Sequence, residues 1–104
     1  KVLVVNLMTK RGETDGFTAG DFVRVVENEL GKNVLDAIVI NSAFPSKRMA
    51  RWYYENEGSV PTHWSREMFK GSSFRVVVKP LLRRDGTFIR HDSQKLARVL
   101  TGML

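Results

Sequence analysis

Two apolar runs separated by a helical pattern constrain the fold of this chain most strongly. Residues 2–5, VLVV, and residues 37–41, AIVIN, have the composition of strands buried on both faces of a parallel sheet. Between them, Gly31 offers a helix stop after apolar residues at helical spacing: Ala19, Phe22, Val25, Val26 and Leu30. A strand, a helix and a strand within about forty residues predict a right-handed parallel crossover.

The ends of the predicted helices carry their own signals. Thr18 and Asp21 stand three apart, as in a capping box. A second helix is expected between Ser46, a capping residue, and Gly58. On that helix, Met49, Tyr53 and either Ala50 or Trp52 are expected to face the sheet.

The last third of the chain predicts one more strand and one more helix. Residues 74–78, FRVVV, form the strand, which Pro80 ends. Asp85–Gly86 is a turn dipeptide, and Asp92 or Ser93 caps a final helix with an apolar stripe at Leu96, Val99, Leu100 and Met103. Residues 59–73 show no clear pattern. The prediction is a single α/β unit over residues 1–104, with a mainly parallel sheet.

Composition limits the classes of function. No apolar run approaches the ~20 residues that cross a bilayer, so no membrane association is expected. The chain has no cysteine, which excludes disulfides and thiolate metal sites, and we expect a cytoplasmic protein. Residues 1–45 carry five bases and six acids, whereas residues 46–104 carry twelve bases and five acids. This basic half is suited to binding phosphate, or is simply a solvated surface.

Asparagine ends both of the first two predicted strands, at Asn6 and Asn41. Ligands of open α/β sheets bind beyond the carboxyl ends of the strands, where two amides can read a base or a sugar. Alternatively, each asparagine bonds its own turn and has no ligand. The loop from Asn6 to Asp21 mixes threonines, glycines, acids and bases, which is more than a plain connection needs.

Arg90 precedes the last helix, whose N-terminal N–H groups favour an anion. Its guanidinium is able to hold two phosphate oxygens. His63 and His91 lack partners at metal-binding spacing, and the sequence shows neither a nucleophile elbow nor a glycine-rich phosphate loop. These residues therefore predict no catalytic group and no metal ligand.

Four stretches resemble the bacterial gluconeogenesis factor family, a branch of the superfamily that includes 2-phospho-L-lactate transferase. The longest begins NLMT at Asn6 and continues with GETD at residues 12–15. IVIN, YENEGSV and IRHDSQKLA follow in the same order, at residues 38–41, 54–60 and 89–97. The sequence departs from the family pattern at Lys10 and Arg11, where many relatives have an uncharged pair.

The resemblance implies a Rossmann-like α/β sandwich that binds a nucleotide sugar such as UDP-N-acetylglucosamine and regulates carbon metabolism and cell-wall growth. It also implies that this chain is the C-terminal part of a larger nucleotide-sugar-binding domain, whose missing N-terminal part is a partner. The residues expected to bind the ligand are Asn6, Thr9, Thr14, Asp15, Asn41, Tyr54 and Arg90.

Two alternatives remain open. One is an enzyme that transfers a phospholactyl group from a guanylyl donor to a deazaflavin with a divalent metal. The other is nucleic-acid binding by the basic half, which lacks a recognised motif and is not favoured. We also expect a homo-oligomer, because the first strand leaves an edge that a second copy would cover.

Overall fold

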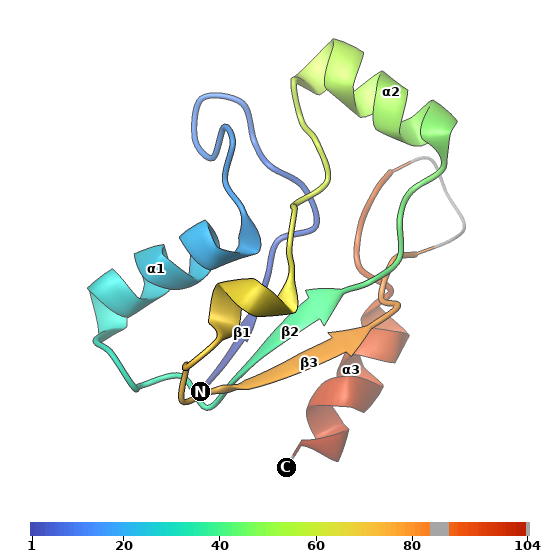
Figure 1. Ribbon diagram of the computed structural model, residues 1–104. Helices are drawn as coiled ribbons and strands as arrows, with labels where there is room; N and C mark the ends of the chain where they lie inside the picture. Colours follow the sequence, from blue (N-terminus) through green and yellow to red (C-terminus); the bar gives the residue numbers. More distant parts are fainter. Residues whose placement is uncertain (84–87, 104) are drawn as a thin grey trace.

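The computed structural model describes residues 1–83 and 88–103. Its elements are β1 (Val2–Val4), α1 (Ala19–Leu30), β2 (Ala37–Asn41), α2 (Lys47–Glu57), the 3₁₀ helix η1 (Arg66–Phe69), β3 (Arg75–Lys79) and α3 (Ser93–Gly102) (Figure 1). The predicted α/β class is confirmed, and every predicted strand and helix is present within a few residues of its expected bounds. The turn expected at Asp85–Gly86 lies outside the described residues.

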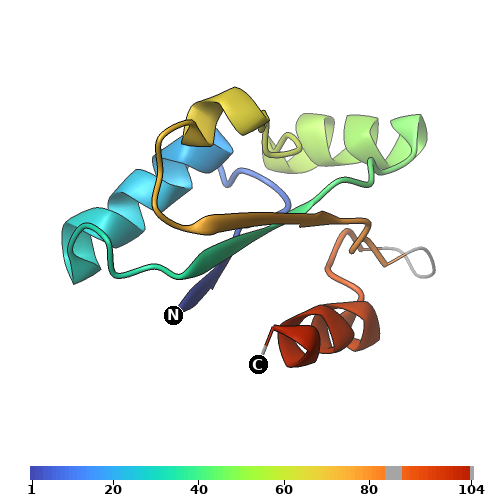
Figure 2. The same ribbon diagram turned by 60° about the horizontal axis from the view of Figure 1, so that its bottom comes forward.

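The three strands form a parallel sheet in the order β1-β2-β3. Ile38 of β2 pairs in register with Leu3 of β1 and Val76 of β3, which confirms the predicted parallel crossover. Figure 2 shows α1 and η1 on one face of this sheet and α3 on the other. Right-handed crossovers that advance in one direction across a sheet place their helices on the same face, and β1-α1-β2-η1-β3 follows that rule.

The core lies between the sheet and the layer of α1 and η1. It contains Val5, Ala19, Val23, Leu35, Ile38, Ile40, Phe69 and Phe74. The prediction of a strand buried on both faces is correct for β2, whose residues 37–40 are all buried. It is wrong for β1, because β1 is an edge of the described sheet and its Val2 is exposed.

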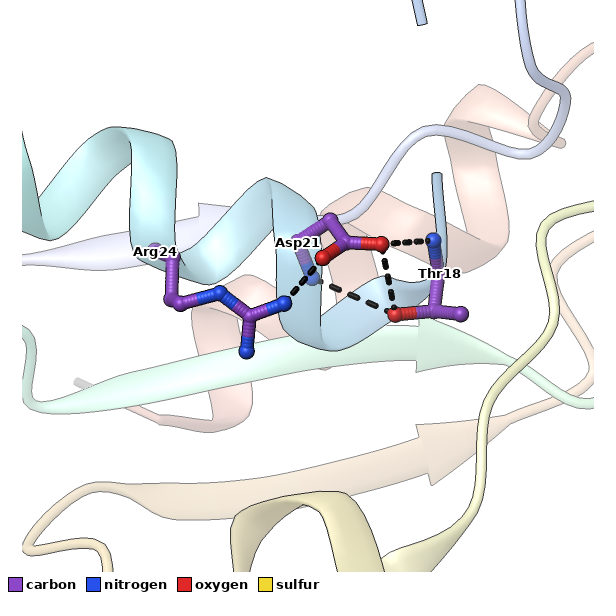
Figure 3. A network of polar contacts seen from close by, with 3 residues as sticks. All are labelled: Thr18, Asp21 and Arg24. Carbon is purple, nitrogen blue, oxygen red and sulfur yellow. Dashed lines mark hydrogen bonds and ion pairs between the residues drawn. The ribbon is translucent and has the colours of Figure 1, made fainter. Parts of the chain in front are cut away.

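The capping box predicted for α1 is confirmed (Figure 3). The Thr18 hydroxyl accepts from the Asp21 N–H at 3.3 Å, and the Asp21 carboxylate accepts from the Thr18 N–H at 2.8 Å. Arg24 pairs with the other carboxylate oxygen of Asp21. These bonds satisfy N–H groups that the first helical turn cannot satisfy itself, so they fix where α1 begins.

Helix α2 has the predicted ends but not the predicted location. The Ser46 hydroxyl accepts from the Met49 N–H at 3.2 Å, and Gly58 ends the helix with a φ of 63°. The helix lies beyond the carboxyl end of the sheet rather than on its face, and none of its residues is buried (Figure 1). Pro45 holds the preceding residue in an extended conformation, so the chain runs away from the sheet before the helix starts.

Residues 59–64, which show no clear pattern in the sequence, return along the loop that follows β1. The Thr9 N–H donates to the Val60 carbonyl at 2.8 Å, and the Thr62 N–H donates to the Leu7 carbonyl at 2.9 Å. The carbonyl of His63 then accepts from the Ala19 N–H at the start of α1. The carboxyl end of β1 is thus covered by a second segment from forty or more residues away.

None of the helices in the described residues is long and apolar enough to cross a membrane.

Candidate functional site

Asn6 and Asn41 line one small pocket at the carboxyl ends of β1 and β2, as the strand-end prediction expected. The pocket has a volume of about 30 Å³, which is room for no more than a few water molecules. Its wall also contains Ser42, Phe44 and Thr62. This pocket is therefore too small to enclose a large ligand.

The side chain of Asn41 has backbone partners on every side. Its amide nitrogen donates to the Ala43 carbonyl at 2.7 Å, and its oxygen accepts from the N–H groups of Ala43 at 3.1 Å and Leu81 at 2.8 Å. The turn-bonding alternative thus describes Asn41, with the addition that Asn41 also ties the chain after β2 to the chain after β3. Asn6, in contrast, is exposed and has no side-chain hydrogen bond within the described residues.

Three other predicted ligand residues use their oxygens to build the loop after β1. The buried Thr9 hydroxyl accepts from the Val60 N–H at 3.1 Å and donates to the Val60 carbonyl at 3.4 Å. The Thr14 hydroxyl accepts from the Lys10 N–H at 2.6 Å, and Asp15 accepts from the Gly12 N–H at 2.8 Å. These bonds hold the loop shape, which in turn positions Asn6 and Arg11.

Arg11 joins this loop to the end of α2. Its guanidinium lies against Gly58, where any Cβ would overlap it. A cation at a helix C-terminus is favoured by the helix dipole, and Gly58 also needs its left-handed conformation to end α2. Position 58 therefore requires glycine for two reasons. A larger residue there would displace the Arg11 side chain and would strain the backbone.

Tyr54 lies on α2 and Arg90 lies in the segment before α3, and a hydrogen bond to Tyr53 joins these two segments. The hydroxyl of Tyr53, the neighbour of Tyr54 on α2, accepts from the Ile89 N–H at 3.0 Å. Ile89 precedes Arg90 in the segment that leads into α3. Both Tyr54, with 64% of its surface exposed, and Arg90 are accessible at this end of the molecule.

The anion site expected at the start of α3 is already used by a carboxylate. Asp92, one of the two predicted caps, accepts from the N–H groups of Gln94 and Lys95, both at 3.1 Å. A phosphate would have to compete with this charge for the same donors. An anion held by Arg90 would therefore lack the help of the helix terminus that the sequence predicted.

Two buried polar atoms near the sheet end lack hydrogen-bond partners within the described residues. They are the hydroxyl of Thr62, which lines the small pocket, and Nε2 of His91. Burial lowers the pKa of His91 below its usual value because the charged form loses hydration. No group of three or more His, Cys, Asp or Glu side chains in residues 1–83 and 88–103 is placed to hold a metal ion.

Exposed aromatic rings are the feature that the sequence showed least clearly. Phe44 is 77% exposed and Phe88 63% exposed, and Trp52 and Tyr54 project from α2. The signal for two of them was in the sequence, because Trp52, Tyr53 and Tyr54 cannot all face inward from one helix. Thr62 lay in a stretch without a pattern, so nothing in the sequence singled it out.

A parallel sheet with a small pocket at its carboxyl end defines an α/β protein of the open-sheet class. A profile of the family described as "2-phospho-L-lactate transferase CofD" matches residues 1–82. Since this match covers most of the chain, the chain belongs to that family.

The chain is also similar to curated gluconeogenesis factors along its whole length. It is 37% identical to the putative gluconeogenesis factor of Aquifex aeolicus, covering 100% of this chain and 31% of that protein. It is 32% identical to the gluconeogenesis factor of Bacillus subtilis, with 100% and 32% covered. The chain thus spans about a third of the length of these relatives. The comparisons do not support its expected placement at their C-terminal end.

A crystal structure of a Bacillus halodurans protein of the UPF0052 family has the same fold, with a TM-score of 0.88 and 24% identity. It covers 97% of this chain, which covers 32% of that protein. At this identity the likeness shows the fold alone.

Proposed function

We propose that this chain takes part in binding a nucleotide sugar of the UDP-N-acetylglucosamine type, and that it regulates carbon metabolism and cell-wall growth in the cytoplasm. The observation that carries the proposal is the hydrogen bond from the Ile89 N–H to the Tyr53 hydroxyl. It ties the helix that carries Tyr54 to the segment that carries Arg90, at the end of the sheet where α/β proteins bind ligands. Similarity to gluconeogenesis factors supports the regulatory role.

The free side chains suit the parts of such a ligand. The Arg90 guanidinium would hold two oxygens of the diphosphate, and the Tyr54 ring would stack on the base or the sugar. The Asn6 amide, which has no side-chain hydrogen bond within the described residues, would bond a sugar hydroxyl. Thr9, Thr14, Asp15 and Asn41 would act indirectly, by holding the loops in place.

The small size of the described pocket implies further contacts. A nucleotide sugar is far larger than a volume of about 30 Å³. We propose that residues outside these 104 complete the site, in keeping with the greater length of the relatives. A second copy of the chain is a further proposed partner, because no described strand covers the outer edge of β1.

Calorimetric titration tests this function. The chain, together with the residues proposed to complete the site, is titrated in parallel with UDP-N-acetylglucosamine, UDP, GDP and N-acetylglucosamine. The expected order of affinity places UDP-N-acetylglucosamine first, UDP weaker because it lacks the sugar, and GDP weaker again. Tighter binding of GDP, or equal weak binding of all four ligands, would contradict the proposal.

The family description favours one second candidate, a 2-phospho-L-lactate transferase. In that reaction the phospholactyl group would pass from a guanylyl donor to a hydroxyl of a deazaflavin, and the nucleotide would leave. Incubation of the chain with donor, acceptor and Mg²⁺, followed by chromatography of the flavin, separates the two functions. The nucleotide-sugar proposal predicts no transferred product, whereas product formation would move the chain to the transferase.

A further inference from the structure

Helix α3 lies on the opposite face of the sheet from α1 (Figure 2), and a basic groove is lined by residues of β3 and α3. Its volume is about 520 Å³, and four of its lining side chains are cations: Arg75 and Lys79 from the strand, Lys95 and Arg98 from the helix. Among the described residues, no acidic side chain lines the groove. None of the four cations has an ion pair within residues 1–83 and 88–103. The groove is therefore an uncompensated patch of positive charge.

The wall of the groove is a strand with a free edge. In the described sheet, β3 pairs with β2 alone. The Arg75 N–H donates to the Asp36 carbonyl and the Lys79 carbonyl accepts from the Ser42 N–H, both at 3.0 Å, so these residues bond toward β2. Backbone groups alternate between the two sides of a parallel strand, and those of Val76 and Val78 consequently point to the open side.

Apolar side chains separate the cations. Val77 lies between Arg75 and Lys79 on the strand, and Val99 and Met103 of α3 line the same groove. Along β3, the face toward the groove thus reads cation, valine, cation. A strand laid beside β3 would place its own side chains opposite these three at the same spacing.

We propose that the outer edge of β3 binds an extended acidic peptide of a partner protein as an additional strand. The peptide would carry an apolar residue opposite Val77 and acidic residues opposite Arg75 and Lys79. Val76 and Val78 would supply two N–H donors and two carbonyl acceptors for the backbone ladder. This is recognition by strand addition, in which the backbone gives affinity and alternate side chains give specificity.

Two other occupants fit this groove less well than an acidic peptide does. A second copy pairing β3 with β3 about a two-fold axis at Val77 would set Arg75 opposite Lys79, and like charges directly opposite each other are destabilising. Single-stranded nucleic acid binds through cations and stacked aromatic rings, but no aromatic side chain lines this groove.

The test uses the full chain and a fluorescent seven-residue peptide with blocked ends, Thr-Glu-Thr-Val-Thr-Glu-Thr. Its symmetric pattern fits β3 in either strand direction. Anisotropy should show binding that weakens with salt, and hydrogen exchange should show new protection of the Val76 and Val78 amides. A peptide with lysine in place of glutamate, and one with proline in place of the two inner threonines, should bind at least roughly tenfold more weakly.

A pair of double variants provides a matched control. Arg75→Glu with Lys79→Glu should weaken peptide binding by roughly tenfold or more, because two attractions become repulsions. Arg66→Glu with Lys70→Glu makes the same charge change at the same spacing, on η1 and the residue that follows it, outside the groove, and should leave affinity within about twofold. Circular dichroism confirms that both variants are folded.

Three results would overturn the proposal. The first is absence of binding or binding without protection of Val76 and Val78. The second is equal loss of affinity in the two double variants. The third is displacement of the peptide by an equimolar oligouridylate, which would assign the groove to nucleic acid.

Discussion

The sheet body and the rim are held together in different ways. The sheet body comprises β1, β2, β3, α1 and η1, and it buries apolar side chains such as Ile38, which is 0% exposed. The rim comprises residues 6–18, 42–58 and 88–92, and its helix α2 has no buried residue. In the rim and at its borders with the neighbouring segments, backbone N–H groups bond to side-chain oxygens of Thr9, Asn41 and Tyr53 instead.

This difference shows which region provides stability and which is available for binding. Burial of apolar area is the main stabilising term in folding, so the sheet body is expected to supply most of the free energy of unfolding. The rim leaves large rings in solvent, among them Phe44 at 77% exposure. Exposed apolar groups beside polar side chains are typical of ligand and partner surfaces.

The largest expected effect is on stability and belongs to the sheet body. Ile38→Ala should lower the free energy of unfolding by about 2–5 kcal/mol, because it leaves a cavity at the centre of the sheet. Phe44→Ala removes a larger side chain from the rim and should change stability by less than about 0.5 kcal/mol. Urea denaturation of both variants provides the comparison, and similar losses would show that the two regions do not differ as described.

The next effect is on ligand affinity and belongs to the rim. Arg90→Ala should weaken nucleotide-sugar binding by about 1.5–3 kcal/mol, roughly ten- to hundredfold, through loss of a charge-assisted contact. Arg90→Lys should lose less, because the ammonium keeps the charge but not the paired donors. Arg66→Ala removes an exposed arginine of η1 as a control. Normal binding by Arg90→Ala would remove this residue from the site.

Two asparagines in the same pocket wall should behave in opposite ways. Asn41→Ala leaves the Ala43 and Leu81 N–H groups without their acceptor and should cost about 1–3 kcal/mol of stability. Asn6→Ala removes a side chain without a hydrogen bond in the described residues. It should therefore lower the affinity for the nucleotide sugar rather than the stability of the fold. Thermal melts of both variants measure the change in stability, and ligand titrations measure the change in affinity. Equal behaviour of the pair would refute this prediction.

The smallest effect is a pH dependence in the sheet body. The Thr18 N–H, and then the Thr18 hydroxyl and Arg24, hold the pKa of Asp21 below its usual 3.8. The unfolded chain therefore binds a proton first, so the contribution of Asp21 is complete above about pH 4 and is lost as the pH falls through the folded pKa. In Asp21→Asn, the free energy of unfolding should fall less steeply as the pH is lowered below about 4. An unchanged slope would show that the capping box contributes no measurable linkage.

Local signals predicted the sheet body well. The apolar composition of AIVIN was enough to predict a buried strand. Thr18 and Asp21 form their capping box within one helical turn, so this prediction did not depend on distant residues either. The sequence also placed Asn6 and Asn41 at strand ends, because a parallel crossover brings these ends to one edge.

Distant contacts decided what the sequence could not predict. The bond from the Leu81 N–H to Asn41 and the pairing of Thr9 with Val60 join residues 40 and 51 apart in the chain. No periodicity encodes such pairs. The same holds for α2, whose cap and end were readable but whose place beyond the sheet depends on the path through Pro45.

Mapping of backbone amide shifts tests most directly whether the rim is the binding region and the sheet body its support. The labelled chain, together with the residues proposed to complete the site, is titrated with UDP-N-acetylglucosamine while its ¹H–¹⁵N spectrum is recorded. We expect saturable shifts at Asn6, Tyr54 and Arg90, together with their neighbours in the rim. Val23, Leu35 and Phe69 in the core should keep constant positions. Shifts concentrated in the sheet body or in the groove between β3 and α3, with the rim unchanged, would contradict this expectation.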